Sequence, residues 1–307
     1  MRLSDELGAD PSPDLLRLHT QVLRRDPALD VRPPGAARVA PSTGIPTAVP
    51  MPRPAQLPAP VGHFTGRVQQ LAALDDLLPE SGGETPIAVV SGAAGAGKTA
   101  LAVQWAHRVA ERFPDGQLFV DLRGHEPDGA LTSSDALAHI LRSLGVPADH
   151  TPTPVAEQAA LYRSLLHGKR ILLVLDNAAS VDVVLPLVPA SATNMLLLTS
   201  RRTMAALATH HAVRAIGVDE FSADEARALL VVLLGADRAG IDGEAADDLA
   251  RLCGRLPLAL RIAAAKLAGQ PGRPIRDFVA ELAGVHRLDA LALEGGSRSV
   301  RAVFASA

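Results

Sequence analysis

The sequence predicts an α/β fold, in which a parallel sheet with flanking helices is followed by a small all-helical domain. Two observations predict it. Five apolar runs alternate with helical patterns between residues 86 and 218, and several are continuously apolar, as strands covered on both faces should be. Beyond Asp219 the strand pattern stops, and only helical patterns follow.

Two segments precede the predicted sheet. Residues 12–25 have the cap, the first-turn proline and the apolar spacing of a helix. In residues 31–60, nine of the thirty residues are proline, which favours an extended and poorly packed linker. We therefore place a domain boundary near residue 60.

The strands and helices follow in alternation. The predicted strands cover residues 86–91, 118–122, 170–176, 194–200 and 212–218. Helices are predicted between them at residues 98–112, 133–144, 154–166 and 178–186. A capping box at Ser222 then opens a helix that ends at Gly235, and further helices are predicted up to Cys253, from Pro257, and over residues 275–284.

The composition argues against several classes of protein. A net charge of −3 gives no basic field for nucleic acid, so we expect no direct nucleic-acid binding by this segment. The N-terminus lacks the apolar core of a signal peptide, and no apolar run approaches the roughly 20 residues of a membrane span. The single cysteine, Cys253, fits a buried thiol in a reducing compartment. We expect a cytoplasmic chain without membrane contact.

A glycine-rich loop between the first strand and the first helix carries the clearest chemistry. Residues 92–99 read GAAGAGKT and fit the pattern G-x-x-x-x-G-K-[ST]. The small residues let backbone N–H groups approach phosphate oxygens, Lys98 brings a charge to the β and γ phosphates, and Thr99 offers a hydroxyl to Mg²⁺. The alternative is a flexible turn, which the flanking strand and helix disfavour. The predicted binding residues here are Gly92, Gly95, Ala96, Gly97, Lys98, Thr99 and Ala100.

Asp176 ends a buried apolar strand and is the predicted carboxylate for Mg²⁺, because the metal needs an acid on a neighbouring strand beside the triphosphate. Capping of the next helix is the alternative role. Many ATPases of this class have a second acid next, to polarise the attacking water. Here that residue is Asn177, which cannot accept a proton, so fast hydrolysis is not expected.

Two further residues are less specific on sequence alone. Arg201 follows the strand at 194–200 and could reach a γ-phosphate, although a solvated basic loop is the alternative. Pro257 could simply start a helix at its first position, and by itself the sequence favours that interpretation. The candidate catalytic residues are therefore Lys98, Asp176 and Arg201, and the candidate metal ligands are Thr99 and Asp176.

Five ordered motifs over about residues 60–290 resemble the NB-ARC nucleotide-binding module of STAND P-loop NTPases. They are FTGR at 64–67, GAAGAGKT, LLVLDN, LLLTSRR and GRLPLAL. The flanks are similar to AfsR/SARP-type bacterial transcriptional regulators. Residues 1–30 resemble the end of their helical activator domain, and residues 287–307 resemble the entry into their winged-helix domain. The resemblance places the α/β domain at 61–218, the helical domain at 219–286, and the chain inside a longer regulator.

The resemblance also implies roles for residues. Phe64, Thr65 and Arg67 would lie against the adenine of ATP or ADP, Pro257 would close over the base, and Arg201 would sense the γ-phosphate. The sequence departs from the family pattern at Gln70, where an acid is common, and at Asn177. The first departure leaves binding intact, and the second limits turnover.

The implied function is a regulatory switch that binds adenine nucleotide with Mg²⁺ and hydrolyses ATP slowly. Its implied partners are upstream DNA-binding and downstream sensor domains of the same regulator, with self-association on activation. Two alternatives stay open on sequence alone. One is a conventional P-loop ATPase or phosphotransferase, and the other is an inert remnant that binds no nucleotide.

Overall fold

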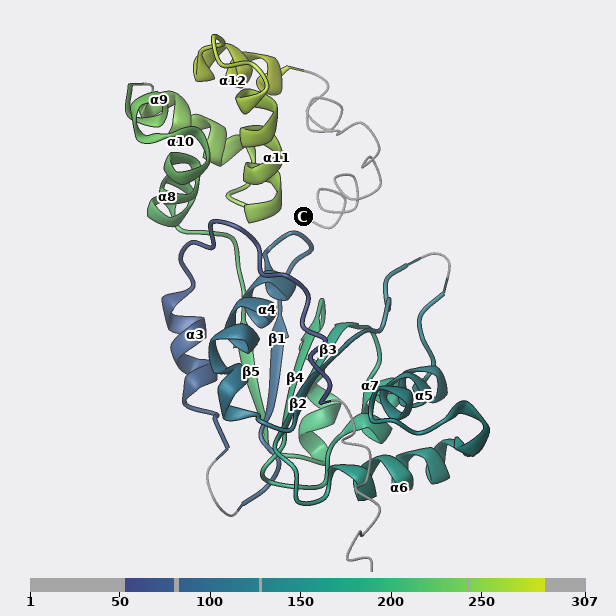
Figure 1. The fold of residues 1–307 in the computed structure, drawn as a ribbon. Helices are drawn as coiled ribbons and strands as arrows, with labels where there is room; N and C mark the ends of the chain where they lie inside the picture. Colours follow the sequence, from purple (N-terminus) through teal and green to yellow (C-terminus); the bar gives the residue numbers. More distant parts are fainter. Residues whose placement is uncertain (1–52, 80–82, 127–128, 242, 285–307) are drawn as a thin grey trace, which may run out of the picture. The chain divides into compact units, whose positions relative to one another are not determined.

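The computed structural model describes residues 53–79, 83–126, 129–241 and 243–284. Within these ranges a five-stranded parallel sheet has the order β2-β3-β4-β1-β5 (Figure 1). The strands are β1 (Ile87–Ser91), β2 (Gly116–Asp121), β3 (Ile171–Ala178), β4 (Met195–Ser200) and β5 (Val213–Gly217). This is the predicted parallel α/β sheet. The predicted helix at 12–25 and the segment 287–307 lie outside the described residues.

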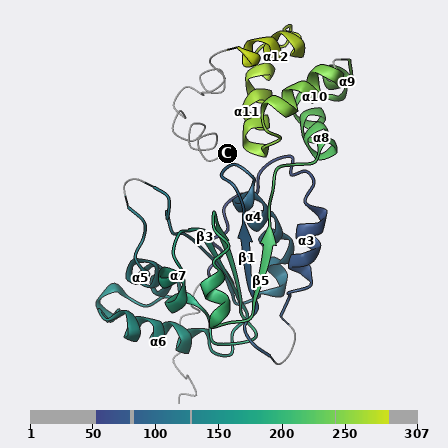
Figure 2. The same ribbon diagram turned by 180° about the vertical axis from the view of Figure 1, so that it is seen from behind.

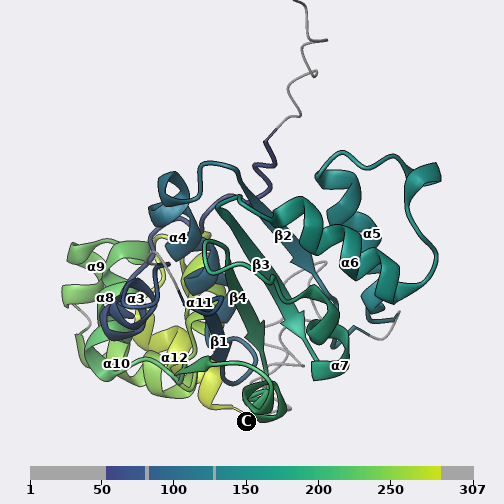
Figure 3. The ribbon, with the colours of Figure 1, turned by 90° about the horizontal axis from the view of Figure 1, so that it is seen from below.

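Helices cover both faces of this sheet, as Figure 3 shows from below. The α-helices are α3 (Val68–Asp75), α4 (Lys98–Val109), α5 (Ser133–Ser143), α6 (Val155–Leu166) and α7 (Val181–Val184). Short 3-10 turns add η2 (Ala110–Arg112), η3 (Ala148–His150), η4 (Leu185–Leu187) and η5 (Ala205–Thr209). The helix α3 lies beside the edge strand β5, which Figure 2 shows from behind.

Side chains along the central strand β1 alternate between two cores. Ala88 and Val90 pack in a core that includes Trp105 of α4. Ile87 and Val89 pack in a second core with residues of α5, α6 and α7. A strand that is buried on both faces in this way explains why the sequence shows continuous apolar runs rather than alternation.

The helices following the sheet make up the rest of the described chain. They are α8 (Ala223–Leu234), α9 (Ala236–Ile241), α10 (Gly243–Leu252), α11 (Pro257–Ala268) and α12 (Ile275–Ala283). The Ser222 hydroxyl accepts a hydrogen bond from the N–H of Glu225, and the Glu225 carboxylate accepts one from the N–H of Ser222, so the predicted capping box is present. Buried leucines such as Leu230, Leu249 and Leu260 pack together, each contributing about 1.5–3 kcal/mol of transfer free energy.

The helix α3 is not among the predicted helices, and two predicted helices differ in extent from those in the structure. Of the eight residues of α3 only Leu74 is buried, so the apolar spacing that marks a helix is weak there. The helix predicted up to Cys253 had no stated start, and the structure has two helices before that residue, α9 and α10. The predicted helix at 178–186 consists of the last residue of β3, the single turn α7 and the 3-10 turn η4. Pro186 lies in η4 and has no N–H for an α-helical hydrogen bond.

The prediction of a poorly packed linker up to residue 60 is wrong for its last residues. Ala55 pairs in parallel with Gln117 of β2, and the N–H of Gln117 donates to the carbonyl of Pro54 at 2.7 Å. The Gln56 side chain donates to Ser143 at 2.7 Å. Proline is tolerated at a sheet edge because the missing N–H can face outward, so this proline-rich segment packs against β2.

No helix among the described residues is both long and apolar enough to cross a membrane. Cys253 is buried, as its apolar surroundings in the sequence predict.

Candidate functional site

The glycine-rich loop connects the end of β1 to the N-terminus of α4. A Cβ at Gly92 would overlap the carbonyl oxygen of Val218, so no other residue type fits at this position. The helix begins at Lys98 after Gly97, which has a left-handed backbone with φ 94°. The first N–H groups of a helix have no partners within it, so this loop presents free donors to an anion.

Lys98 is largely buried, with 8% of its surface exposed. Its ammonium donates to the carbonyl of Ala93 at 2.8 Å, which is a neutral acceptor, and within the described part of the chain no carboxylate forms an ion pair with it. Burial, together with the nearby Arg201, lowers the pKa of Lys98 to about 8, and Asp176 opposes that shift. A cation held in this way is well suited to an anionic ligand.

Asp176 is also buried, with 3% of its surface exposed. The hydroxyl of Thr99 lies 2.8 and 3.0 Å from its two carboxylate oxygens, which brings both predicted metal ligands together. Thr199 donates to the same carboxylate at 2.5 Å. Burial raises the pKa of Asp176 and the repulsion of Asp121 adds to it, whereas the hydrogen bonds from Thr199 and Thr99 lower it.

The expectation that Asp176 lies on a strand next to β1 is wrong. The strand order places β4 between β1 and β3. The gap is closed by side chains, because Thr99 at the start of α4 and Thr199 near the end of β4 both donate to Asp176. Sequence position alone gives strand ends but not strand order, so Thr199 was not predicted as part of this network.

A cavity of about 520 Å³ lies over the glycine-rich loop. Predicted site residues that line it are Gly95, Gly97, Lys98, Thr99, Ala100, Arg201 and Pro257. The cavity is also lined by Pro58, Ala59, Val61, Ala94, Val103, Asn177, Leu258 and Arg261. The N–H of Leu258, at the start of α11, donates to the carbonyl of Gly95 at 3.3 Å. Pro257 therefore lies beside the loop and lines the same cavity, and its closure over the base stays a prediction.

A smaller cavity of about 30 Å³ adjoins this region, and Phe64, Thr65, Arg67 and Ala96 line it together with Pro257. It has room for about one or two waters and not for a purine ring. The structure therefore brings Phe64, Thr65 and Arg67 beside Ala96 of the glycine-rich loop. Gly92 lines neither cavity, since its backbone packs on Val218.

Arg67 makes more protein contacts than the sequence suggested. Its guanidinium donates to the carbonyls of Ala96 at 3.0 Å and Asp219 at 2.6 Å, and it lies 4.6 Å from the ring centre of Phe221. Its backbone N–H donates to Glu225 at 2.9 Å. Burial acts to raise the pKa of Glu225, but hydrogen bonds from Arg67 and Ser222 hold it below its usual range. Arg67 thus connects the glycine-rich loop with the start of α8.

Arg261 is a cavity residue that the sequence reasoning missed. It lies one turn after Pro257 on α11 and donates to the carbonyls of Gly62 at 2.7 Å and His63 at 2.9 Å. Residues four apart on a helix share a face, so the spacing from Pro257 was a usable indication. Burial, and then the positive charges of Arg201 and Lys98, lower the pKa of His125, which is not among the residues that line this cavity.

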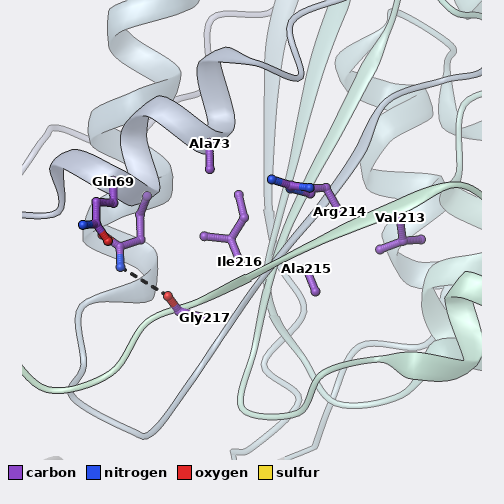
Figure 4. Close-up of a pocket in the computed structure, with 8 residues that line it drawn as sticks. Gln69, Ala73, Val213, Arg214, Ala215, Ile216 and Gly217 are labelled. Carbon is purple, nitrogen blue, oxygen red and sulfur yellow. Dashed lines mark hydrogen bonds between the residues drawn. The ribbon is translucent and has the colours of Figure 1, made fainter.

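A further cavity, of about 450 Å³, lies between α3 and β5 (Figure 4). Its lining includes Gln69 and Ala73 from α3 and Arg214 from β5. Gln70 lines it as well and donates to the carbonyl of Gly217 at 3.4 Å, so the residue that replaces a common acid lies here. The glycine-rich loop and Asp176 do not line this cavity, so it is separate from the candidate nucleotide site.

Comparisons with known proteins agree with this geometry. Residues 83–235 match the family model of an AAA domain. The chain is 40% identical over 314 residues to the regulatory protein AfsR of Streptomyces coelicolor and 41% identical over 304 residues to that of Streptomyces griseus. Each alignment covers 98% of this chain and 30% of the relative, so the chain spans about a third of the length of these regulatory proteins.

Among solved structures, a Walker-type ATPase of Pyrococcus abyssi superposes with a TM-score of 0.52 at 12% identity, over 75% of each chain, which supports the fold alone. The loop, the Thr99–Asp176 pair and the matched family model agree with one another. The chain therefore contains a P-loop NTPase domain, and nearly all of it is similar to one part of AfsR-type regulatory proteins.

Proposed function

We propose that this chain is the nucleotide switch of a bacterial transcriptional regulator, an NB-ARC module of the STAND type that binds ATP or ADP and hydrolyses ATP slowly. In this proposal residues 61–218 form the nucleotide-binding domain and residues 219–286 the helical domain. Lys98 and Arg201 contact phosphates, and Phe64, Thr65 and Pro257 lie on the side of the base. Arg67 couples the loop to the helices.

The observation that carries the proposal is the composition of the 520 Å³ cavity. It is lined by the glycine-rich loop on one side and by Pro257, Leu258 and Arg261 of α11 on the other. A ligand that contacts both parts stabilises the arrangement in which it fits best. A ligand shifts an equilibrium only by its difference in affinity between two states, and contacts from two separate parts of the chain supply such a difference.

The contacts of Arg67 support the same coupling. A single side chain links Ala96 in the loop with Asp219, just before α8, and its backbone N–H is bound by Glu225 of α8. A change in the loop on exchange of ADP for ATP would therefore alter hydrogen bonds at the start of α8.

The residues present also fit Mg²⁺. Thr99 and Asp176 offer a hydroxyl and a carboxylate, which are the hard oxygen donors that this ion prefers, and they lie within hydrogen-bond distance of each other. Bound there, Mg²⁺ would neutralise charge on the phosphates of the nucleotide.

The partners in this proposal are DNA-binding and sensor domains that are attached to the chain in a full-length regulator. The activated form self-associates. The regulator acts in the cytoplasm. The relatives extend far beyond the aligned third, which leaves room for such domains. Nucleic acid is not a proposed ligand of this segment, because its net charge of −3 gives no basic surface in bulk.

The test is to identify by mass spectrometry the nucleotide released when the purified chain is denatured, and to measure the melting temperature with added ADP or ATP. At a ligand concentration of 100 times Kd we expect about 2.7 kcal/mol of added stability. We also expect ATP hydrolysis to be far slower than the roughly 10 turnovers per second that are typical of enzymes. Turnover of many ATP molecules per second without a partner would indicate a conventional ATPase, and no response to any adenine nucleotide would overturn the proposal.

A further inference from the structure

The carboxamide of Asn177 lies between two carboxylates. Its Nδ2 atom donates to Oδ1 of Asp121 at 3.0 Å and to Oδ2 of Asp176 at 3.1 Å. An ionised carboxylate only accepts hydrogen bonds, so the NH₂ end of the amide must face both acids. The two acceptors therefore fix which end of this side chain is the nitrogen.

The backbone around Asn177 holds the amide in the same place. Asn177 has a left-handed backbone with φ 55°, within an irregularity in the pairing of β3 with β4. Its N–H donates to the hydroxyl of Thr199 at 3.0 Å. Asparagine tolerates this conformation better than most residues, and such strained positions gather at functional sites when the surroundings stabilise them.

Asp121 is itself anchored. It ends β2 directly opposite Asp176 of β3 in the parallel register, and its Oδ1 atom also accepts the N–H of Arg123 at 2.9 Å. The carboxylate is thus fixed by the sheet and by the turn that follows it. It can hold the Asn177 amide without itself reaching the cavity lining.

Asn177 lines the 520 Å³ cavity together with Lys98, Thr99 and Arg201. With Nδ2 committed to Asp121 and Asp176, the Oδ1 atom is the end of the amide that is free of these two bonds. An amide oxygen accepts a hydrogen bond from water but does not accept a proton at neutral pH. It can therefore orient a water molecule without acting as a base.

We infer that Asn177 orients the attacking water for ATP hydrolysis through its Oδ1 atom, and that Asp121 is the positioning residue that holds the Asn177 amide in this orientation. This inference rests on the proposed function. It gives the residue that replaces the second acid of related ATPases a defined role, and it assigns Asp121 a role that the sequence pattern did not suggest.

In the reaction, the water oxygen bonds to the γ-phosphorus while the bond from that phosphorus to the β,γ-bridging oxygen breaks, and ADP leaves with the electron pair. Asn177 accepts a hydrogen bond from the water and takes up no proton. The proton passes to an oxygen of the phosphoryl group and then to solvent. Since general-base help is worth about 10²–10⁴ in rate, an amide at this position gives slow turnover.

The experiment measures single-turnover ATP hydrolysis and, separately, the Kd for ADP in four variants. We expect Asn177→Ala to lower the hydrolysis rate about 10- to 100-fold and Asp121→Ala to lower it about 3- to 10-fold. The Kd for ADP should change less than about threefold in both. The matched control is Asp115→Ala, because Asp115 likewise accepts a backbone N–H, from Arg170, where β2 and β3 begin rather than end. It should hydrolyse ATP at the wild-type rate.

The fourth variant exchanges the two side chains, Asp121→Asn with Asn177→Asp. It keeps the net charge and the hydrogen bond between the two positions, and it puts a proton acceptor where the amide was. We expect it to hydrolyse ATP about 10-fold faster than the wild type or more. Because its rate is expected to rise, this variant also tests the role of Asn177 if wild-type hydrolysis is too slow to measure.

Wild-type rates in Asn177→Ala and Asp121→Ala, with ADP binding intact, would overturn the inference. So would an exchanged variant that binds ADP and hydrolyses no faster than the wild type. If the wild-type chain does not bind ADP, the proposed function is contradicted instead. Failure of the inference about Asn177 and failure of the proposed function are therefore distinguishable.

Discussion

The two sides of the cavity are built from different kinds of structure. On the phosphate side, Lys98 begins the helix α4 and Asp176 lies on the buried strand β3, and both side chains are almost fully buried. The other side consists of the segment around Val61 and the start of α11, joined through the carbonyls to which Arg261 donates. Loops open at lower free energy than buried strands do. We therefore expect the phosphate side to stay in place when a ligand binds, and we call the side that contains Val61 and the start of α11 the adjustable side.

The largest expected effect comes from the phosphate side. Lys98→Ala removes the cation that lies in the cavity, and we expect affinity for ADP and for inorganic pyrophosphate to fall at least about 100-fold, or roughly 2.7 kcal/mol. Titration calorimetry measures both ligands. Lys169→Ala is the control, because Lys169 precedes β3 at the opposite end of that strand from Asp176. Unchanged binding of pyrophosphate in Lys98→Ala would contradict the assignment of the phosphate side.

The second effect concerns the connection between the two sides. Gly66 has φ 71°, and a Cβ there would overlap the carboxylate of Glu225, which binds the N–H of Arg67 and closes the capping box of α8. We expect Gly66→Ala to destabilise the chain by about 2 kcal/mol in urea unfolding. Gly272→Ala, with open space at its Cβ, should stay within about 0.5 kcal/mol. Equal stability of the two variants would show that the Glu225 contact matters little.

The adjustable side should give a smaller and more selective effect. Arg261→Ala frees the carbonyls of Gly62 and His63, and we expect Kd for ADP to rise about 10-fold while Kd for pyrophosphate stays constant. The matched control is Arg251→Ala, which removes an exposed arginine paired with Asp248 on α10. If pyrophosphate binding falls together with ADP binding, the two sides are not independent.

The smallest effect is a dependence of binding on pH. Lys98 has a pKa of about 8 in the structure, and a bound phosphate favours its charged form. Below pH 8 the lysine is already charged, so affinity is constant. Above that pH a proton must be taken up on binding, so affinity falls. We expect Kd for ADP to rise about threefold from pH 7.5 to 8.5. The dependence should be absent in Lys98→Met at whatever residual affinity remains.

Much of the phosphate side was predictable, because its chemistry lies in contiguous residues. The pattern from Gly92 to Thr99 and the buried strand that ends at Asp176 were sufficient to expect a P-loop fold, and the matched AAA domain confirms it. The role of Thr199 depends on strand order, which places β4 between β1 and β3. Local sequence patterns do not give that order, since every buried strand looks alike.

The other side was less predictable for a different reason. Arg261 and Glu225 contact residues nearly 200 and about 160 positions earlier in the chain, and both contacts use backbone groups. Backbone acceptors and donors occur at every residue, so the sequence gives no indication of which ones will be used. Asp121 was not predicted for another reason: its hydrogen bond joins it to the side chain of Asn177, 56 residues away, on a strand whose pairing with β2 the sequence does not give.

The segment before Val61 has a practical consequence for dissecting this protein. Pro54 and Ala55 bind β2, and a few residues later Pro58, Ala59 and Val61 form part of the cavity lining. A fragment that begins after residue 60, where the composition changes, would lose the segment that pairs with β2 and also Pro58 and Ala59 of the cavity lining. Recombinant fragments intended for nucleotide titrations should therefore begin before Pro54, so that the pairing with β2 and the whole cavity lining are kept.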